Sequence, residues 1–211
     1  LDHTARLGVV TTAATGWLGT PSIEGHRDGE AVGALFSLTD LRATDDALEF
    51  HFTDVELGLS ARYELRVTAS GLVRARTTVR NDADTPYTVQ ALHTTLPLPW
   101  DATEILDTTG RHLRERSAQR HEFTFGAHVR ETRRGRPGAD ATLLLAAGIP
   151  GFGFERGRVH GVHLAWSGNA RIFAERVPTG EAFLGAGELY LPGEIRLARG
   201  EEIASPELLG S

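Results

Sequence analysis

The 211-residue sequence contains no cysteine, no lysine and no methionine, and only 7% of its residues are aromatic. The absence of cysteine excludes disulfide bonds, thiolate nucleophiles and cysteine-based zinc sites. All 22 basic residues are arginine, which excludes Schiff-base chemistry and lysine-dependent motifs. Because methionine is missing, we expect that Leu1 is not the native start and that the sequence is a piece of a longer chain.

The sequence also has little net charge and no long apolar run. Its formal charge of −6 argues against a nucleic-acid-binding surface. No apolar stretch is long enough to span a bilayer, and no signal-peptide pattern is present, so a membrane partner is not expected. The length is enough to bury a sizeable core in one large domain or two small ones.

What the sequence does contain is a succession of short β patterns. In Arg62–Thr68, apolar Tyr63, Leu65 and Val67 alternate with charged residues, which is typical of a half-solvated antiparallel strand. Turn signals at Ser70-Gly71 and Asn81–Pro86 lie about a dozen residues apart, the spacing of a β-sandwich. Tyr87–Leu96 is expected as one strand and Glu201–Ser211 as a polar tail. No segment indicates a long helix, so the sequence predicts an all-β sandwich.

Gly157–Asn169 is the clearest single segment, an apolar run followed by the turn residues Ser167-Gly168-Asn169. Its two largely apolar faces predict a central strand that is covered on both sides. Trp166 at the strand end allows two interpretations, a packed core aromatic or the aromatic platform of a sugar site. His160 and His163 fall on opposite faces of such a strand, so they cannot share a metal ion. We expect no metal and no cofactor.

Ala13–Asp28 is expected to be a long loop, because glycine, proline and serine occur throughout it. It carries aromatic and charged residues, namely Trp17, Glu24, His26, Arg27 and Asp28. The loop is interpreted either as ordinary solvated surface or as a binding loop, since long loops with such residues are often functional.

A search for catalytic motifs finds none. The sequence has no Gly-x-Ser-x-Gly, no Walker loop and no dinucleotide fingerprint. Asp45-Asp46 and Glu201-Glu202 are adjacent carboxylates in polar segments and are interpreted as solvated. No carboxylate pair is placed by the sequence for the roughly 5–9 Å separation that a glycosidase requires. Catalytic residues are therefore not expected in this chain.

Several motifs, in a consistent order, resemble the N-terminal domain of family 36 glycoside hydrolases, the bacterial α-galactosidases or melibiases. The strongest is HLAWSGN at His163–Asn169, and EGHRDG at Glu24–Gly29 and GAGELYLPGEIRLARGE at Gly185–Glu201 are also similar. Further matching positions are Glu115-Arg116, Gln119-Arg120, Gly126, Glu131, Arg134-Gly135-Arg136 and Gly148–Phe152. The resemblance covers most of the chain.

The resemblance implies a galactose mutarotase-like β-supersandwich, two large antiparallel sheets face to face, as a single non-catalytic domain over residues 1–211. It implies a catalytic (β/α)₈ barrel downstream of this chain, with two aspartates acting in a retaining mechanism on terminal α-galactosides. The family's nucleophile lies in a Lys-Trp-Asp motif, which this lysine-free chain lacks; its only Trp-Asp is Trp100-Asp101.

The expected partners follow from the same resemblance: the barrel, a galactoside in the full enzyme, and further copies of the protein in a homo-oligomer. The family's domain sends a loop from its beginning towards the sugar pocket, so substrate binding is assigned to Glu24, His26, Arg27 and Asp28, together with Trp17. The resemblance also implies a bacterial, cytoplasmic protein.

Two other classes remain open. One is a free-standing carbohydrate-binding module. The other is a mutarotase-like sugar epimerase, which needs a histidine and a carboxylate converging in one cleft. His93, His121, His128 and His163 are available for that role, but the sequence does not pair any of them with an acid.

Overall fold

The structure is a computed structural model that describes residues 8–31 and 33–211. Within these residues the helical content is one 3-10 turn, η1 (Ala13–Thr15), and every strand pairing in the sheets is antiparallel. No helix in this part of the chain is both long and apolar enough to cross a membrane. The predicted all-β architecture with little helix is confirmed.

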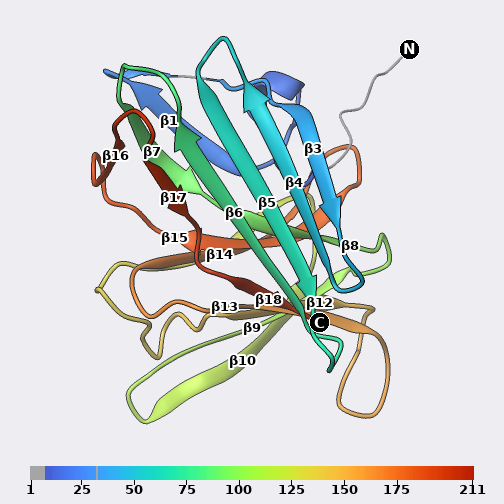
Figure 1. Cartoon of the computed structure of the whole chain (residues 1–211). Helices are drawn as coiled ribbons and strands as arrows, with labels where there is room; N and C mark the ends of the chain where they lie inside the picture. Colours follow the sequence, from blue (N-terminus) through green and yellow to red (C-terminus); the bar gives the residue numbers. More distant parts are fainter. Residues whose placement is uncertain (1–7, 32) are drawn as a thin grey trace.

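The first layer is a twisted ten-stranded sheet, here called the large sheet (Figure 1). In spatial order its strands are β10 (Arg114–Glu122), β9 (Glu104–Arg111), β12 (Leu144–Gly148), β13 (Val159–Leu164), β18 (Leu208–Gly210), β6 (Val73–Asn81), β5 (Leu59–Val67), β4 (Ala47–Asp54) and β3 (Ser37–Ala43), with β17 (Glu202–Ala204) beside β6.

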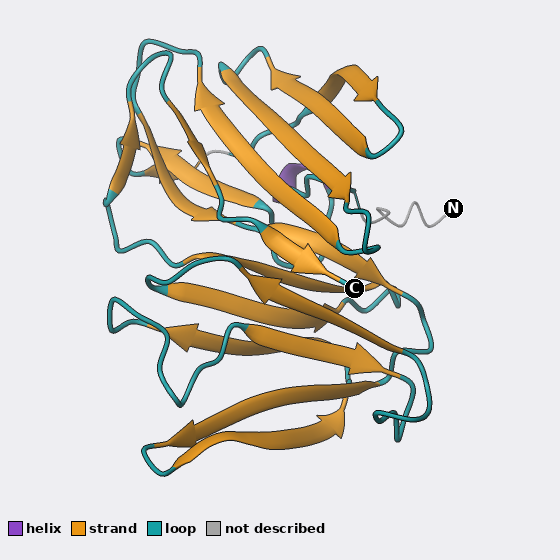
Figure 2. Cartoon of the chain, turned by 60° about the horizontal axis from the view of Figure 1, so that its bottom comes forward, coloured by secondary structure: helices purple, strands orange, loops and turns teal. Residues whose placement is uncertain are grey.

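The second layer consists of two four-stranded sheets (Figure 2). The family resemblance predicts two large sheets face to face; the first layer is one such sheet, and the second layer is divided into two. The β1 sheet has the order β16 (Ile195–Leu197), β7 (Tyr87–Leu92), β1 (Ile23–Arg27), β2 (Glu30–Ala31). The β14 sheet has the order β11 (Gly126–Thr132), β14 (Ala170–Arg176), β15 (Ala182–Glu188), β8 (Thr94–Leu98).

The division of the second layer occurs at His93. The sequence predicts one strand over Tyr87–Leu96, and the structure breaks it into β7 and β8, which belong to different sheets. The backbone N–H of His93 still bonds the β1 side of the chain, the carbonyl of Ser22 at 2.7 Å, whereas the next residue, Thr94, pairs with Ala186 of β15. This change of partner strand between two adjacent residues has no counterpart in the local pattern, which is why the pattern alone predicted a continuous strand.

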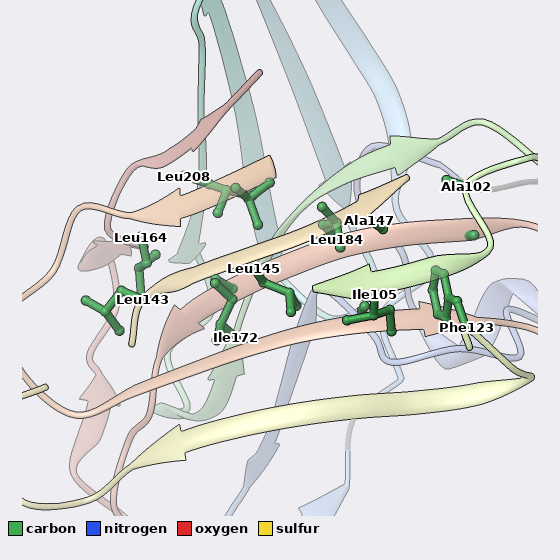
Figure 3. Packing of buried hydrophobic residues seen from close by; sticks show 14 of the residues in the cluster. Ala102, Ile105, Phe123, Leu143, Leu145, Ala147, Leu164, Ile172, Leu184 and Leu208 are labelled. Carbon is green, nitrogen blue, oxygen red and sulfur yellow. The ribbon is translucent and has the colours of Figure 1, made fainter. Parts of the chain in front are cut away.

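Each half of the second layer has its own apolar core against the large sheet. Between the large sheet and the β14 sheet, Leu145 and Leu164 pack with Ile172 and Leu184 (Figure 3). Between the large sheet and the β1 sheet, Leu59 and other apolar side chains of β5 and β6 pack with β1, β7 and β16. The period-2 alternation of the strands places these side chains inward, and their burial is the main source of stability.

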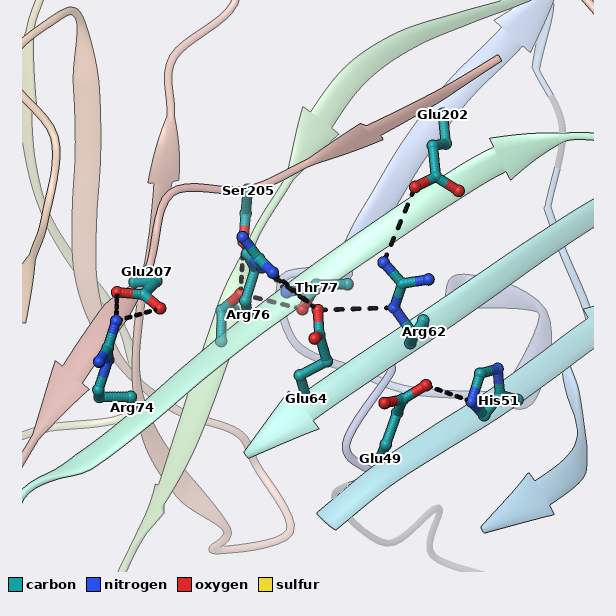
Figure 4. Close-up of polar contacts among 11 residues, drawn as sticks. Glu49, His51, Arg62, Glu64, Arg74, Arg76, Thr77, Glu202, Ser205 and Glu207 are labelled. Atoms are coloured by element: carbon teal, nitrogen blue, oxygen red, sulfur yellow. Dashed lines mark hydrogen bonds and ion pairs between the residues drawn. The ribbon is translucent and has the colours of Figure 1, made fainter. Parts of the chain in front are cut away.

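The outward face of β4, β5 and β6 carries a ladder of charges, as the alternation in Arg62–Thr68 predicts (Figure 4). Glu64 accepts from Arg76 at 3.2 Å and lies 3.5 Å from Arg62, and Arg74 pairs with Glu207 at 2.5 Å. On the inward face Tyr63 is buried and its hydroxyl donates to the carbonyl of Thr95 at 3.1 Å. Because the charged pairs are partly exposed, they keep this face soluble more than they stabilise the fold.

Two further expectations need correction. Glu201–Ser211 is not a polar tail: it forms β17 and β18, and Leu208 is fully buried. The strand in Gly157–Asn169 is central, as predicted, but only one of its faces is covered. Val162 and Leu164 enter the core, whereas Val159 and His163 on the opposite face are exposed.

We predict that the neighbouring leucines of β12, Leu144 and Leu145, contribute unequally to the free energy of unfolding. Leu145→Ala should lower the free energy of unfolding by about 2–5 kcal/mol, because it opens a cavity in the core. Leu144→Ala is the matched control on the opposite face, where Leu144 is 50% exposed, and it should change stability by no more than about 0.5 kcal/mol. Urea unfolding measures both, and equal losses would contradict the assigned strand orientation.

We also predict an acid-sensitive contribution from His93. Its ring is buried against Phe173, with ring centroids 5.2 Å apart. Burial, with a smaller contribution from the charge of Arg171, lowers the pKa of His93 from 6.5 to about 4. The unfolded chain therefore takes up the proton first, so stability is full above about pH 6.5 and declines as the pH falls to about 4.

The pKa of His93 is about 2.5 lower in the folded chain than in the unfolded chain, which corresponds to roughly 3 kcal/mol in the free energy of unfolding. Glutamine at position 93 has no titratable group. The loss of stability between pH 6.5 and 4, measured by urea unfolding, should therefore be roughly 3 kcal/mol smaller in His93→Gln than in the native chain. His112→Gln, which replaces a side chain that is 91% exposed, should leave the pH dependence as it is. An unchanged profile in His93→Gln would refute the assignment.

Candidate functional site

Three of the five residues predicted for substrate binding lie together at the exposed end of the β1 sheet. Glu24 and His26 point away from the core from β1, because the alternate residues Ile23 and Gly25 are buried. Asp28 follows in the turn and is exposed. Within the described residues no hydrogen bond to the Glu24 side chain occurs, so its carboxylate is free to accept bonds from a ligand.

The segment is a hairpin, not the long loop that the sequence predicts up to Asp28. β1 pairs with β2 through Arg27 opposite Glu30, and Asp28 and Gly29 form the connection. Both have positive φ, 49° and 91°, a conformation that Asp tolerates better than most residues and glycine adopts freely. The N–H of Gly29 donates to Nδ1 of His26 at 2.9 Å. The hairpin therefore holds these polar groups on a defined backbone.

Arg196 of β16 joins this group and was not predicted. In the β1 sheet β7 lies between β1 and β16 (Figure 1). Thr88 of β7 lies opposite His26 on one side and opposite Arg196 on the other, so the three residues form a row across the strands. The guanidinium of Arg196 lies 3.5 Å from the carboxylate of Asp28. We call Glu24, His26, Asp28 and Arg196 the hairpin cluster. Arg196 is 168 residues from Asp28, and no local pattern connects them.

Arg27 points to the opposite side of β1 and fixes the hairpin to the sandwich. Its guanidinium donates to the carbonyls of Leu57, at 2.7 Å, and Thr85, and to Oδ1 of the buried Asn81, at 3.0 Å. It also lies 5.5 Å from the ring centre of Tyr87, whose pKa is raised to about 12 by burial. Because these contacts use the guanidinium, the structure gives Arg27 a positioning role.

Trp17 is not part of the hairpin cluster. Its ring is buried at 6% exposure and packs 5.6 Å from the ring of Phe183, with Phe173 and Val177 beside it. These residues lie on the face of the β14 sheet that points away from the large sheet, so the segment after η1 acts as a cover for that face. The structure thus places the Trp17 ring in a packed apolar cluster, apart from the other four predicted residues.

Trp166 borders a second feature, a surface cavity of about 630 Å³. Glu115, Arg116 and His163 also line it, and Trp166 is 38% exposed. The turn beneath the ring is tightly built: a Cβ at Gly168 would lie 2.6 Å from the indole nitrogen, which donates to the carbonyl of Asn169 at 3.0 Å. Both interpretations of this aromatic remain open, since the ring is packed on the turn and also borders a cavity.

A histidine and a carboxylate do converge elsewhere, as an epimerase would require. Nε2 of His128 and Nε of Arg130 donate to the same oxygen of Asp107, at 2.6 and 2.5 Å. Burial raises the pKa of Asp107, and the hydrogen bonds from Arg130 and His128 outweigh it, so the net pKa lies below its usual range. The Asp107 side chain is 1% exposed, so a sugar ring cannot reach it. The sequence missed this pair because its residues come from two sheets.

The family model of the glycosyl hydrolase family 36 N-terminal domain matches residues 3–198. The chain belongs to this family. An α-galactosidase of Escherichia coli is 33% identical over 208 residues, which are 99% of this chain and 29% of that protein. The family 36 motifs that the sequence presents are therefore those of a true member.

Solved structures of family 36 α-galactosidases share this fold. AgaB of Geobacillus stearothermophilus superposes with a TM-score of 0.80 at 17% identity, over 90% of this chain and 29% of that protein. A variant of AgaA from the same organism, solved with raffinose, gives 0.81 at 18% identity, over 90% and 30%. The chain thus spans less than a third of the length of these relatives. The likeness confirms the predicted sandwich fold.

Proposed function

We propose that this family 36 chain is the non-catalytic N-terminal sandwich of a retaining α-galactosidase that hydrolyses terminal α-galactosides. The observation that carries the proposal is the match of nearly the whole chain to 29% of the length of an E. coli α-galactosidase. The remaining length in such a protein is sufficient for a catalytic barrel of about 250 residues or more.

The chain's own residues support a non-catalytic role. It has no lysine, so the Lys-Trp-Asp motif of the family's nucleophile is absent. In Trp100-Asp101 the indole is exposed and the carboxylate forms an ion pair with Arg158 at the surface. The nucleophile and the acid/base of the proposed reaction are two aspartates of the barrel that would follow this sandwich.

The hairpin cluster is proposed to form one wall of the sugar pocket of its own or a neighbouring subunit. Glu24 and Asp28 can accept hydrogen bonds from vicinal hydroxyls, and Arg196 can donate them in pairs. The turn at Asp28-Gly29 projects these groups beyond the strands, and Arg27 holds the hairpin in place through Leu57 and Asn81. Such a wall binds and orients a galactoside without taking part in bond cleavage.

The sandwich is further proposed to pack against the barrel and to take part in a homo-oligomer. Large apolar side chains stand open on its surface, including Trp100, Leu113, Phe125 and Phe154. β3 is an edge strand of the large sheet and is exposed along its whole length, with Leu38 and Leu41 half exposed. Surfaces of this kind are covered in an assembled protein more often than in a free module.

We predict that the hairpin cluster contributes to substrate recognition in the full-length enzyme. Glu24→Gln, Asp28→Asn and Arg196→Gln should each lower kcat/KM for α-galactosides by roughly ten- to a hundredfold, the effect of losing a hydrogen bond to a charged group. Asparagine is chosen at position 28 because it tolerates the positive φ. The melting temperature should stay nearly unchanged.

Asp45→Asn is the matched control, because Asp45 is an exposed carboxylate in the turn between β3 and β4. Arg27→Leu should instead lower the melting temperature, since it removes the contacts to Leu57 and Asn81. If all three cluster variants keep wild-type kinetics, the hairpin is ordinary surface and the proposed sugar wall is wrong.

We predict that the 211-residue chain alone does not hydrolyse an aryl α-galactoside, because the two catalytic carboxylates lie outside it. It should also fail to accelerate galactose mutarotation in polarimetry, since the carboxylate paired with His128 is buried. Turnover of the aryl galactoside that persists after repurification would overturn the non-catalytic assignment. Faster mutarotation than in buffer would favour the epimerase alternative.

A further inference from the structure

The two layers of the sandwich meet at an edge where the apolar core gives way to a polar cluster. β10 is the last strand of the large sheet and β11 is the last strand of the β14 sheet. The chain passes from one to the other through Phe123–Phe125, and Phe123 is the last residue of this connection in the core. Beyond it the space between the layers is occupied by Asp107, His121 and His128.

These three side chains come from three different strands and converge on one point. His121 of β10 lies opposite Ile105 of β9, and Asp107 is two residues further along β9 on the same face. His128 comes from β11 in the facing sheet. One potential ligand atom from each residue lies within 4.8 Å of the others, and the two imidazole rings have centroids 4.4 Å apart.

The carboxylate of Asp107 has an oxygen that the protein leaves without a partner. Its Oδ2 accepts hydrogen bonds from His128 and Arg130. Its Oδ1 is buried and has no hydrogen-bond partner among the described residues, although the side chain is 1% exposed. An unpaired buried charged oxygen is costly, and it is the kind of atom that a bound cation would satisfy.

We propose that Asp107, His121 and His128 form a binding site for a divalent transition metal of the zinc class, which clips the two layers together at their open edge. Two imidazole nitrogens with one carboxylate oxygen suit Zn²⁺ and its neighbours, whereas Mg²⁺ and Ca²⁺ prefer oxygen ligands alone. The site is separate from the hairpin cluster and does not depend on α-galactosidase activity.

The distances fit this coordination after small side-chain rotations. Tetrahedral Zn²⁺ with bonds of about 2.0–2.1 Å separates its ligand atoms by about 3.3 Å. One possible ligand atom of each residue already lies within 4.8 Å of the others, and a turn of the carboxylate brings Oδ1 toward the two imidazoles. In the metal-bound form Nε2 of His128 turns from Oδ2 of Asp107 to the ion, and Arg130 keeps its hydrogen bond to Oδ2.

A route for the ion and a fourth position are also present. A surface cavity of about 190 Å³ is lined by both His121 and His128, so a water molecule in it can complete the tetrahedron. Nδ1 of His121 is 3.4 Å from the carbonyl of Glu122, which leaves Nε2 of that ring for the metal. The cavity therefore gives an ion from solvent access to the two imidazoles.

Arg130 is compatible with the site because it holds the other oxygen of the carboxylate. Its Nε donates to Oδ2 of Asp107, and its Nη2 donates to Oε1 of Gln119 at 2.8 Å. Metal-ligating carboxylates commonly accept hydrogen bonds from an outer residue, which orients them. Because the chain has no cysteine, a disulfide cannot cross-link the two sheet edges, and a bound metal ion can do so instead.

The test uses chelator-treated chain and zinc sulfate in isothermal titration calorimetry. We expect one equivalent to bind saturably and to raise the melting temperature. His121→Gln and His128→Gln should each weaken zinc binding by at least about tenfold to a hundredfold, since loss of an outer partner of a ligand already costs that much and these variants remove the ligand itself. Cobalt(II) should give the visible absorption of a four-coordinate site in the native chain and lose it in both variants.

His112→Gln is the matched control, because His112 lies in the turn of the same β9–β10 hairpin and is exposed. It should bind zinc as the native chain does. Asp107→Asn tests the third ligand, and the two histidine variants decide the matter if that variant does not fold, since neither histidine is fully buried. Absence of saturable binding would overturn the inference, as would unchanged zinc affinity in His121→Gln and His128→Gln.

Discussion

The large sheet depends on the hydrogen bonds of one three-residue strand. β18 pairs with β13 on one side and with β6 on the other, through Leu208, Leu209 and Gly210. Without it, the β3–β6 and β9–β13 parts of the sheet would have no shared ladder. Gly210 lets the strand lie close to Leu96, whose terminal methyl would have to move to admit a Cβ at that position. The continuity of the sheet therefore depends on the pairing of β18 with β13 and β6.

The divided second layer determines which surfaces remain available. The β14 sheet is covered on both faces, by the large sheet on one side and by the Trp17 segment on the other, so it serves as structural support. The β1 sheet is covered on one face only, and its open face presents the hairpin cluster. The proposed sugar wall and the proposed metal clip accordingly lie in different parts of the sandwich, one on the β1 sheet and one at the edge shared with the β14 sheet.

The candidate site could be predicted in part. Glu24, His26 and Asp28 are close in sequence, so a motif of six residues was enough to bring them together. Arg196 and the Asp107–His128 pair were not predictable, because their neighbours are set by strand order and layer packing. Arg27 and Trp17 were assigned to the sugar site because the family resemblance places their loop near the pocket, and sequence does not show where a side chain points. Arg27 instead bonds Leu57 and Asn81, and Trp17 packs on Phe183.

The sequence by itself determined the all-β class, most strand positions and the family, because side-chain alternation and turn residues are local properties that a single strand expresses. Only the tertiary structure decided the strand order, the break at His93 and the burial of Leu208 in a segment that looks like a polar tail. β18 has just three residues, too few to show a period, and its place is fixed by partners more than 40 residues away along the chain. Long-range pairing of that kind leaves no mark in local sequence, since the energy that selects it arises only when the two layers come together.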